Sequence, residues 1–187
     1  MAYRCTPLPL LLVLVFVLGP AGARADQRDP RLDALFEELR TVTDPVVVRS
    51  VEQEIWSIWM EVDDRDTALA MVRGTRLLQQ GRLGEAEAAF DAAIGLRPRF
   101  AEAWNKRATV RYLAGDLAGS MADIRATLSL EPRHFGALSG LGMIYDRLDE
   151  PRAALQSYAA ALALDPHIDG LRARVEALRD DLAGDRI

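Results

Sequence analysis

The segment that decides the fold is IGLRPRF at residues 94–100, because it recurs as LSLEPRH at 128–134 and as LALDPHI at 162–168. The proline of each copy lies 34 residues from the proline of the next. Each copy also carries a leucine two residues before its proline and closes an apolar, alanine-rich stretch. A fixed period of this length predicts a solenoid built from repeated helix–turn–helix units.

Each unit is predicted to contain two helices separated by a turn. Gly81 and Gly115 mark the first two turns and Pro151 ends the third, since glycine commonly follows a helix and proline commonly begins one. The predicted first helices are 67–80, 101–114 and 135–148, and the predicted second helices are 83–96, 117–130 and 151–164. The residues predicted to fill the core between the paired helices share one position of the period: Phe90, Ile124 and Tyr158.

The spacing resembles that of the tetratricopeptide repeat, in which an aromatic residue, Leu-Gly, Tyr, Ala, a large apolar residue, Ala and Pro follow in order. The unit at 67–100 has Leu77 in place of Tyr, and the unit at 101–134 has Arg111 there. The resemblance implies an all-α fold, a right-handed solenoid of three helix pairs. The unit at 135–168 is the most similar, with Leu141, Gly142, Tyr145, Ala154, Tyr158, Ala161 and Pro166.

Amphipathic segments flank the three repeats on both sides. Residues 169–187 carry leucines and a valine at helical spacing, which predicts a helix that caps the end of the solenoid. Residues 26–66 predict an N-terminal extension of two helices. A shift of 34 residues places Phe36 at the position of Trp104, so this extension is also a candidate for a degenerate fourth repeat.

Residues 1–25 have the three parts of a secretory signal peptide. A basic start is followed by the apolar run 8–18 and by small residues, so cleavage is expected after Ala25. The run has about half of the ~20 apolar residues that a membrane span needs, so no stable membrane insertion is expected after cleavage. All basic residues except one are arginine, which indicates GC-rich coding and hence a bacterium. The predicted location is therefore the periplasm.

Charge and cysteine content exclude several classes of function. Loss of the leader removes Arg4 and Arg24, so the net charge changes from −5 to −7. An acidic protein is poorly suited to nucleic acid and to anionic membrane surfaces, so neither partner is expected. The one cysteine, Cys5, lies in the leader, and this excludes thiol catalysis and zinc–thiolate sites from the mature chain.

No motif indicates an enzyme, a cofactor or a metal site. The sequence has no glycine-rich phosphate loop, nucleophile elbow or His-Glu-x-x-His. His134 and His167 each follow a proline that ends a repeat, which favours a turn or capping role over metal binding. The acidic residues within 61–66 lack the spacing of a calcium loop, and they are interpreted as a solvated linker that caps a helix beginning near Thr67.

Partner binding is predicted on the first helices of the repeats. Helical spacing places Asn105, Thr109 and Tyr112 on one stripe that faces away from the packed side. The resemblance implies that this concave stripe holds a peptide or a helix of a partner protein. Lys106, the only lysine, and Arg111 flank the stripe and are interpreted as solvated charges. The full set of predicted contacts is Met71, Thr75, Gln79, Asn105, Thr109, Tyr112, Ser139, Met143 and Arg147.

The predicted function is a non-enzymatic adaptor or scaffold in the periplasm, which binds a peptide or helix of an envelope protein on the concave surface. Met71 and Thr75 stand where a clamp for a C-terminal carboxylate would begin, so binding of such a tail is not expected. One alternative is a structural subunit of an envelope assembly that contacts partners through its outer helices and caps. Another is an enzyme that uses carboxylates such as Asp63 and Asp64. In a further alternative the stripe binds no partner, or an N-terminal segment of the same protein fills the groove, and a homo-oligomer is compatible with each of these.

Overall fold

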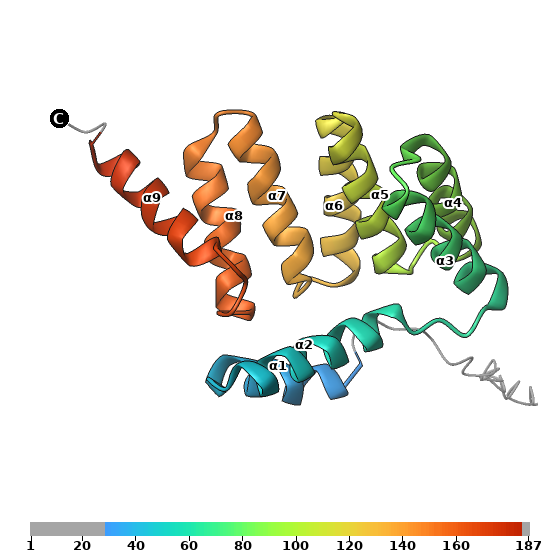
Figure 1. Cartoon of the computed structure of the whole chain (residues 1–187), viewed down its shortest axis with the longest axis horizontal. Coiled ribbons are helices and arrows are strands. Elements are labelled where there is room, and N and C mark those ends of the chain that lie inside the picture. Colours follow the sequence, from blue (N-terminus) through green and yellow to red (C-terminus); the bar gives the residue numbers. More distant parts are fainter. Residues whose placement is uncertain (1–28, 185–187) are drawn as a thin grey trace, which may run out of the picture.

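The computed structural model describes residues 29–184, which form nine α-helices and contain no strand (Figure 1). The predicted signal peptide and its cleavage after Ala25 lie outside the described residues. The repeat helices are α3 (Arg65–Gln79), α4 (Leu83–Leu96), α5 (Ala101–Ala114), α6 (Leu117–Leu130), α7 (Phe135–Arg147) and α8 (Pro151–Leu164). They stand side by side as three antiparallel pairs, and this confirms the predicted all-α solenoid. Every predicted boundary of these helices agrees to within two residues.

Glycine allows the two helices of a pair to approach closely in the first and third repeats. A Cβ atom added to Gly74 would lie 2.6 Å from the ring of Phe90, and one added to Gly142 would lie 2.4 Å from the ring of Tyr158. Both aromatic rings are buried. Real Cβ atoms do not come this close to a neighbour. Only glycine therefore leaves room for the large aromatic ring that the facing helix packs at this position.

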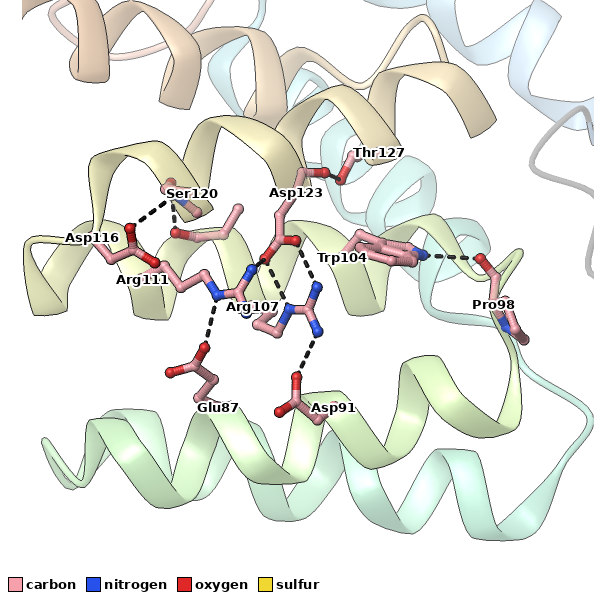
Figure 2. Close-up of polar contacts among 12 residues, drawn as sticks. Glu87, Asp91, Pro98, Trp104, Arg107, Arg111, Asp116, Ser120, Asp123 and Thr127 are labelled. Carbon is pink, nitrogen blue, oxygen red and sulfur yellow. Dashed lines mark hydrogen bonds and ion pairs between the residues drawn. The ribbon is translucent and has the colours of Figure 1, made fainter.

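The second repeat replaces part of this apolar packing by ion pairs (Figure 2). Arg107 donates to the two carboxylate oxygens of Asp123 at 2.9 and 2.7 Å, and it also contacts Asp91 at 2.5 Å. Arg111 donates to Glu87 at 2.7 Å and to Asp123 at 3.1 Å. The side chain of Asp123 is 2% exposed, so α4, α5 and α6 meet around a buried carboxylate. The interpretation of Arg111 as a solvated charge is wrong, because its guanidinium is needed to neutralise this group.

The N-terminal helices α1 (Arg31–Thr41) and α2 (Pro45–Met60) form a hairpin that lies across the ends of the repeat helices (Figure 1). Asp44 caps α2 by accepting the backbone N–H of Val46 at 2.8 Å. The hairpin contacts α5 and α8, whereas α2 makes no contact with α3. The pair therefore does not take the place that a fourth stacked repeat would occupy.

Aromatic residues fix the hairpin on the third repeat. The indole of Trp59 stacks on the imidazole of His134, with ring centroids 4.3 Å apart and an angle of 11° between planes. Phe36 and Trp59 also pack against Phe135, the first residue of α7. At the other end of the hairpin the ring of His167 lies 3.0 Å from the carbonyl oxygen of Leu39. These contacts join residues up to 128 positions apart in the sequence, so no repeat period predicts them.

The final helix, α9 (Leu171–Gly184), packs its apolar stripe against the third repeat. Leu171, Val175 and Leu178 are buried in one cluster with Tyr158. Arg174 donates to both carboxylate oxygens of Asp146 on α7, at 2.9 and 2.7 Å. None of the described helices has the length and apolar character that crossing a membrane requires.

Candidate functional site

A cavity of about 410 Å³ lies between α5 and α7, with α6 behind it. Its walls are mostly apolar, with a few hydroxyl and amide groups and one carboxyl group. This composition is typical of sites that bury an apolar ligand and fix its register with a few polar contacts. The residues that line it are Asn105, Ala108, Thr109, Tyr112 and Leu113 of α5, Ser120 and Ile124 of α6, Phe135, Gly136, Ala137, Ser139, Gly140 and Met143 of α7, and Trp56, Asp165 and Ile168.

The structure brings together the predicted contact residues of the second and third repeats. Asn105, Thr109 and Tyr112 face Ser139 and Met143 across the cavity. Met143 is 43% exposed, so a partner can reach its flexible thioether side chain. The stripe deduced from helical spacing therefore lines a concave feature in these two repeats.

The predicted contacts of the first repeat lie elsewhere. Met71 is 2% exposed, because it shares the buried face of α3 with Thr67 and Gly74. Its prediction as a partner contact is wrong, since its side chain belongs to the core around Phe90. Thr75 is half-buried and its hydroxyl has no hydrogen-bond partner among the described residues, while Gln79 is exposed. None of these residues lines the cavity.

Arg147 lies near one end of the cavity without lining it. Its guanidinium carbon is 5.0 Å from the ring centroid of Tyr112, and its Nη1 donates to the carbonyl oxygen of Tyr112 at 3.1 Å. A cation over an aromatic face is attracted to the ring quadrupole, so Arg147 holds the Tyr112 ring in place. Arg147 thus places one positive charge beside the end of the cavity where α5 and α7 terminate.

A buried polar cluster supports the opposite end. Glu102 is 0% exposed, and its Oε2 accepts hydrogen bonds from Nε2 of His134 at 2.9 Å and from Nδ2 of Asn105 at 3.0 Å. Burial acts to raise the pKa of Glu102, but the hydrogen bond from His134 and the charge of Lys106 outweigh it and lower the pKa. His134 also caps α7, since its Nδ1 accepts the N–H of Ala137 at 3.1 Å, and this confirms the predicted capping role.

Lys106 belongs to the same cluster, so its interpretation as a solvated charge is wrong. Its Nζ lies 3.1 Å from Oε1 of Glu102 and 5.6 Å from the ring centroid of Trp56. Its side chain is only 28% exposed. The single lysine therefore joins α5 to the hairpin, and it orients Asn105 indirectly through their shared partner Glu102.

Sequence reasoning missed the residues that the hairpin and the last turn contribute. Trp56 of α2 closes one end of the cavity against Gly136, where an added Cβ would lie 2.9 Å from the indole. Asp165, the C-cap of α8, lies in the same region. The signal available was the pair of glycines on α7, Gly136 and Gly140, because two missing side chains on one helical face leave space for a neighbour.

A buried carboxyl group lies at the same end of the cavity as Trp56. Asp165 is 1% exposed, and its Oδ1 accepts the backbone N–H of His167 at 2.9 Å. The charges of Asp165 and of Glu52 on α2 influence each other. Burial raises the pKa of both groups, and the neighbouring charge of Asp165 raises that of Glu52 further.

The acidic linker before α3 shows no arrangement for metal binding. Asp64 caps α3 by accepting the backbone N–H of Thr67 at 2.8 Å and its hydroxyl at 2.5 Å, which confirms the predicted capping role. Asp63 pairs with Arg97 at 3.3 Å. Among residues 29–184 no three His, Cys, Asp or Glu side chains converge as metal ligands would.

Comparisons with known proteins agree with this geometry. Family models described as tetratricopeptide repeat match residues 71–130 and 136–168. A TPR repeat-containing protein of Rhizobium etli is 35% identical over 190 aligned residues, which cover 96% of this chain and 93% of that protein.

Two solved structures share the fold of the repeats. The first TPR domain of Spaghetti (RPAP3), bound to the HSP90 peptide SRMEEVD, is 20% identical with a TM-score of 0.61, over 65% of this chain and 97% of that domain. The TPR2B domain of yeast Sti1, in a pHsp70 complex, is 15% identical with a TM-score of 0.58, over 63% of this chain and 99% of that domain. At these identities the likeness is one of fold.

Proposed function

Because the chain belongs to the tetratricopeptide-repeat family, we propose that it is a non-enzymatic adaptor, which binds a peptide or a helix of a partner protein in the cavity between α5 and α7. The observation that carries the proposal is the cavity itself, where Asn105, Thr109 and Tyr112 face Ser139 and Met143. Apolar side chains of the partner would supply most of the affinity by burial. The hydroxyl groups of Thr109 and Ser139 would fix its register.

A peptide ligand suits this cavity for two reasons. Its volume of about 410 Å³ accommodates a few apolar side chains, not a folded domain. The Spaghetti domain of the same fold is bound to an HSP90 peptide, which supports a peptide as the class of occupant here.

We further propose the periplasm as the site of action. The support is the leader pattern of residues 1–25, with its basic start, apolar run and small residues before Asp26. Fractionation of cells that express the chain with a C-terminal tag would test this. Recovery in the osmotic-shock fraction, with an N-terminus at Asp26, is expected. A cytoplasmic protein that retains Met1 would contradict the location and leave the adaptor role intact.

The test of the adaptor role is site-specific photo-crosslinking in cells. A photo-reactive phenylalanine derivative replaces Tyr112 in one variant and Arg172, exposed on α9, in the control. A discrete adduct from position 112 alone is expected. It should disappear when Met143→Glu places a charge on the opposite wall.

Adducts from position 172 alone would overturn the proposal. They would favour instead a structural subunit that contacts its assembly through outer helices and caps. The exposed Leu69 and Val72 on α3, at 56% and 65%, give that alternative a second apolar surface to be probed in the same way.

A further inference from the structure

The two ends of the row of repeats differ in what covers them (Figure 1). At the C-terminal end, α9 packs Leu171, Val175 and Leu178 against the third repeat. At the N-terminal end, α3 contacts only α4 and α5 among the described helices, because the hairpin lies against the second and third repeats. One side of α3 is therefore left uncovered.

The 34-residue period shows that this side of α3 corresponds to a junction between repeats. Leu69 is the equivalent of Ala103, and Arg76 is the equivalent of Val110. Ala103 and Val110 are fully buried, since they pack in one cluster with α4, the second helix of the preceding repeat. Their equivalents in the third repeat are buried in a cluster with Ile124 of α6. On α3 the same surface has no helix packed on it.

The uncovered side has an apolar centre. Leu69 and Val72 are 56% and 65% exposed, and their spacing makes them neighbours on one face of the helix. Arg65 and Arg76 continue this face by one turn on either side. We call Arg65, Leu69, Val72 and Arg76 the open face of α3. A helix packed along the open face would remove both apolar side chains from water.

Arginine side chains surround this apolar centre, although the chain has a net charge of −5. Arg65, Arg76 and the adjacent Arg73 are exposed, and none of them forms an ion pair within residues 29–184. Glu85, which lines a hollow with Arg73, is bound by another arginine. Asp66 lies in the first turn of α3, where the helix dipole favours a carboxylate. The fold therefore leaves an excess of positive charge around the open face.

Charge and backbone chemistry decide what suits this face. A second copy of the chain would place arginines opposite arginines, and like charges across an interface are unfavourable. A helix satisfies its own backbone hydrogen bonds, whereas an extended segment would find few partners on the side of α3. A helix with apolar side chains and flanking carboxylates complements both the apolar centre and the arginines.

We propose that the open face of α3 binds an acidic amphipathic helix of a partner protein, which takes the place of the second helix of a preceding repeat. Leu69 and Val72 bury its apolar side chains, and the three arginines pair with its carboxylates. This face is separate from the cavity between α5 and α7, so the inference goes beyond the adaptor role proposed for that cavity. One chain then joins two partners.

Selection of helical peptides on the purified full chain tests this directly. A phage-displayed library of helical peptides is first depleted on the Leu69→Glu variant, which removes ligands of other surfaces, and is then panned on the wild type. We expect enrichment of apolar residues at helical spacing with Asp or Glu beside them. The best sequence is synthesised, and its Kd is measured by fluorescence anisotropy.

Two double variants separate the apolar contribution from the ionic one. Leu69→Ala with Val72→Ala should weaken binding by roughly 10-fold to 100-fold, because these side chains form the centre of the contact. Arg73→Gln with Arg76→Gln should weaken it by roughly 3-fold to 10-fold at low salt, the size expected for exposed ion pairs. The second loss should disappear at high salt, because salt screens exposed charges.

The matched controls change exposed residues of the same types in the third repeat. Leu148→Ala and Arg152→Gln should leave the Kd unchanged. Tyr112→Ala should also leave it unchanged, and this separates the open face from the cavity. Circular dichroism of each variant confirms that its helices are retained.

Several results would overturn the proposal. They include a selection that yields no helical ligand, enriched helices that are basic, and binding that ignores Leu69→Ala with Val72→Ala. A dimer in light scattering that Leu69→Glu dissociates would assign the open face to a second copy of the chain. Co-sedimentation with vesicles of phosphatidylglycerol and phosphatidylcholine, lost on Arg73→Gln with Arg76→Gln and without a helical ligand, would assign it to an anionic membrane surface.

Discussion

The stacked repeats and the N-terminal hairpin are held in place by different kinds of contact. Each repeat helix packs on the helices next to it in the chain, and Gly74 and Gly142 admit the facing rings of Phe90 and Tyr158. The hairpin does not contact the helices of the first repeat, although that repeat follows it in the chain. It packs on the third repeat through Trp59 and other aromatic residues. Repetition specifies contacts between neighbours, whereas a contact with a distant repeat depends on individual side chains.

The largest expected effect is a loss of stability caused by a substitution in the second repeat. Asp123→Ala leaves Arg107 and Arg111 without their shared buried partner, and removal of one member of a buried ion pair costs about 3–5 kcal/mol. Urea unfolding followed by circular dichroism would measure the loss in the free energy of unfolding.

The control for this variant introduces the residue types of the other repeats. Arg107→Leu and Arg111→Tyr, combined with Asp123→Ala, give the residues found at these positions in the third and first repeats. Apolar replacement of a whole ionic group is often neutral or stabilising, so the triple variant should recover most of the loss. A triple variant as unstable as the single one would show that the ion pairs are not interchangeable with repeat packing.

The next largest effect is a loss of hairpin docking while the repeats stay folded. Trp59 is 0% exposed, and truncation of a buried Trp to Ala costs about 3–5 kcal/mol. Because the hairpin opens as a unit, amide exchange should accelerate by roughly 100-fold or more in 31–60 and little in 65–96. Trp104→Ala, outside the hairpin, is the matched control and should show the reverse pattern. Uniform loss of protection in both variants would mean that the regions unfold together.

A smaller effect tests whether the size of residue 74 must match the size of the facing residue 90. Gly74→Ala places a methyl group against the ring of Phe90, and overpacking of this kind costs about 1–3 kcal/mol. In a Phe90→Ile background the same change should be neutral or stabilising, because Ala has the higher helix propensity and the second repeat already pairs Ala108 with Ile124. Equal costs in both backgrounds, measured by thermal unfolding, would refute size complementarity at this position.

The smallest effect distinguishes the two regions by pH. Arg174 lowers the pKa of Asp146, so this contact stabilises the cap above the unfolded pKa of about 4 and is lost as the pH falls through the lowered value. Burial raises the pKa of Glu52 and of Asp165, so their contribution is fully present below about pH 4 and is lost as the pH rises through the raised values.

Acidification from pH 7 to about pH 4 should therefore strengthen hairpin docking and leave the cap unchanged. Amide exchange, corrected for intrinsic rates, would measure both regions in one sample. The double variant Glu52→Gln and Asp165→Asn should lose this part of the response. The same response in the double variant would exclude the carboxyl pair as its source.

The sequence was sufficient for the repeats because their contacts are local and periodic. The 34-residue spacing gave the six repeat helices, and the shared position of Phe90, Ile124 and Tyr158 gave their core. The prediction of Met71 as a contact was wrong because it assumed that equivalent positions of the repeats have equivalent surroundings. Asn105, 34 residues later, borders the cavity, whereas Met71 lies on the buried face of α3. The 34-residue spacing predicts the helices of each repeat, but it does not predict which residues surround them.

The rest of the candidate site had no signal of that kind. Trp56 reaches the cavity through a hairpin that contacts a repeat distant in sequence, and Asp165 belongs to the turn that follows α8. The buried Glu102 also pairs with both Lys106 and His134, and His134 lies 32 residues further along the chain. Such convergence depends on tertiary structure, and composition or spacing does not reveal it.

The position of the hairpin has a mechanical consequence. A solenoid whose units touch only their neighbours behaves as a spring, which lengthens and shortens by small rotations between units. Here a linker of four residues ties α2 to the first repeat, while the aromatic contacts anchor the hairpin to the third. The hairpin is therefore a strut between the second and third repeats, which it contacts through Lys106 and Phe135, and it should limit rotation between the two walls of the cavity.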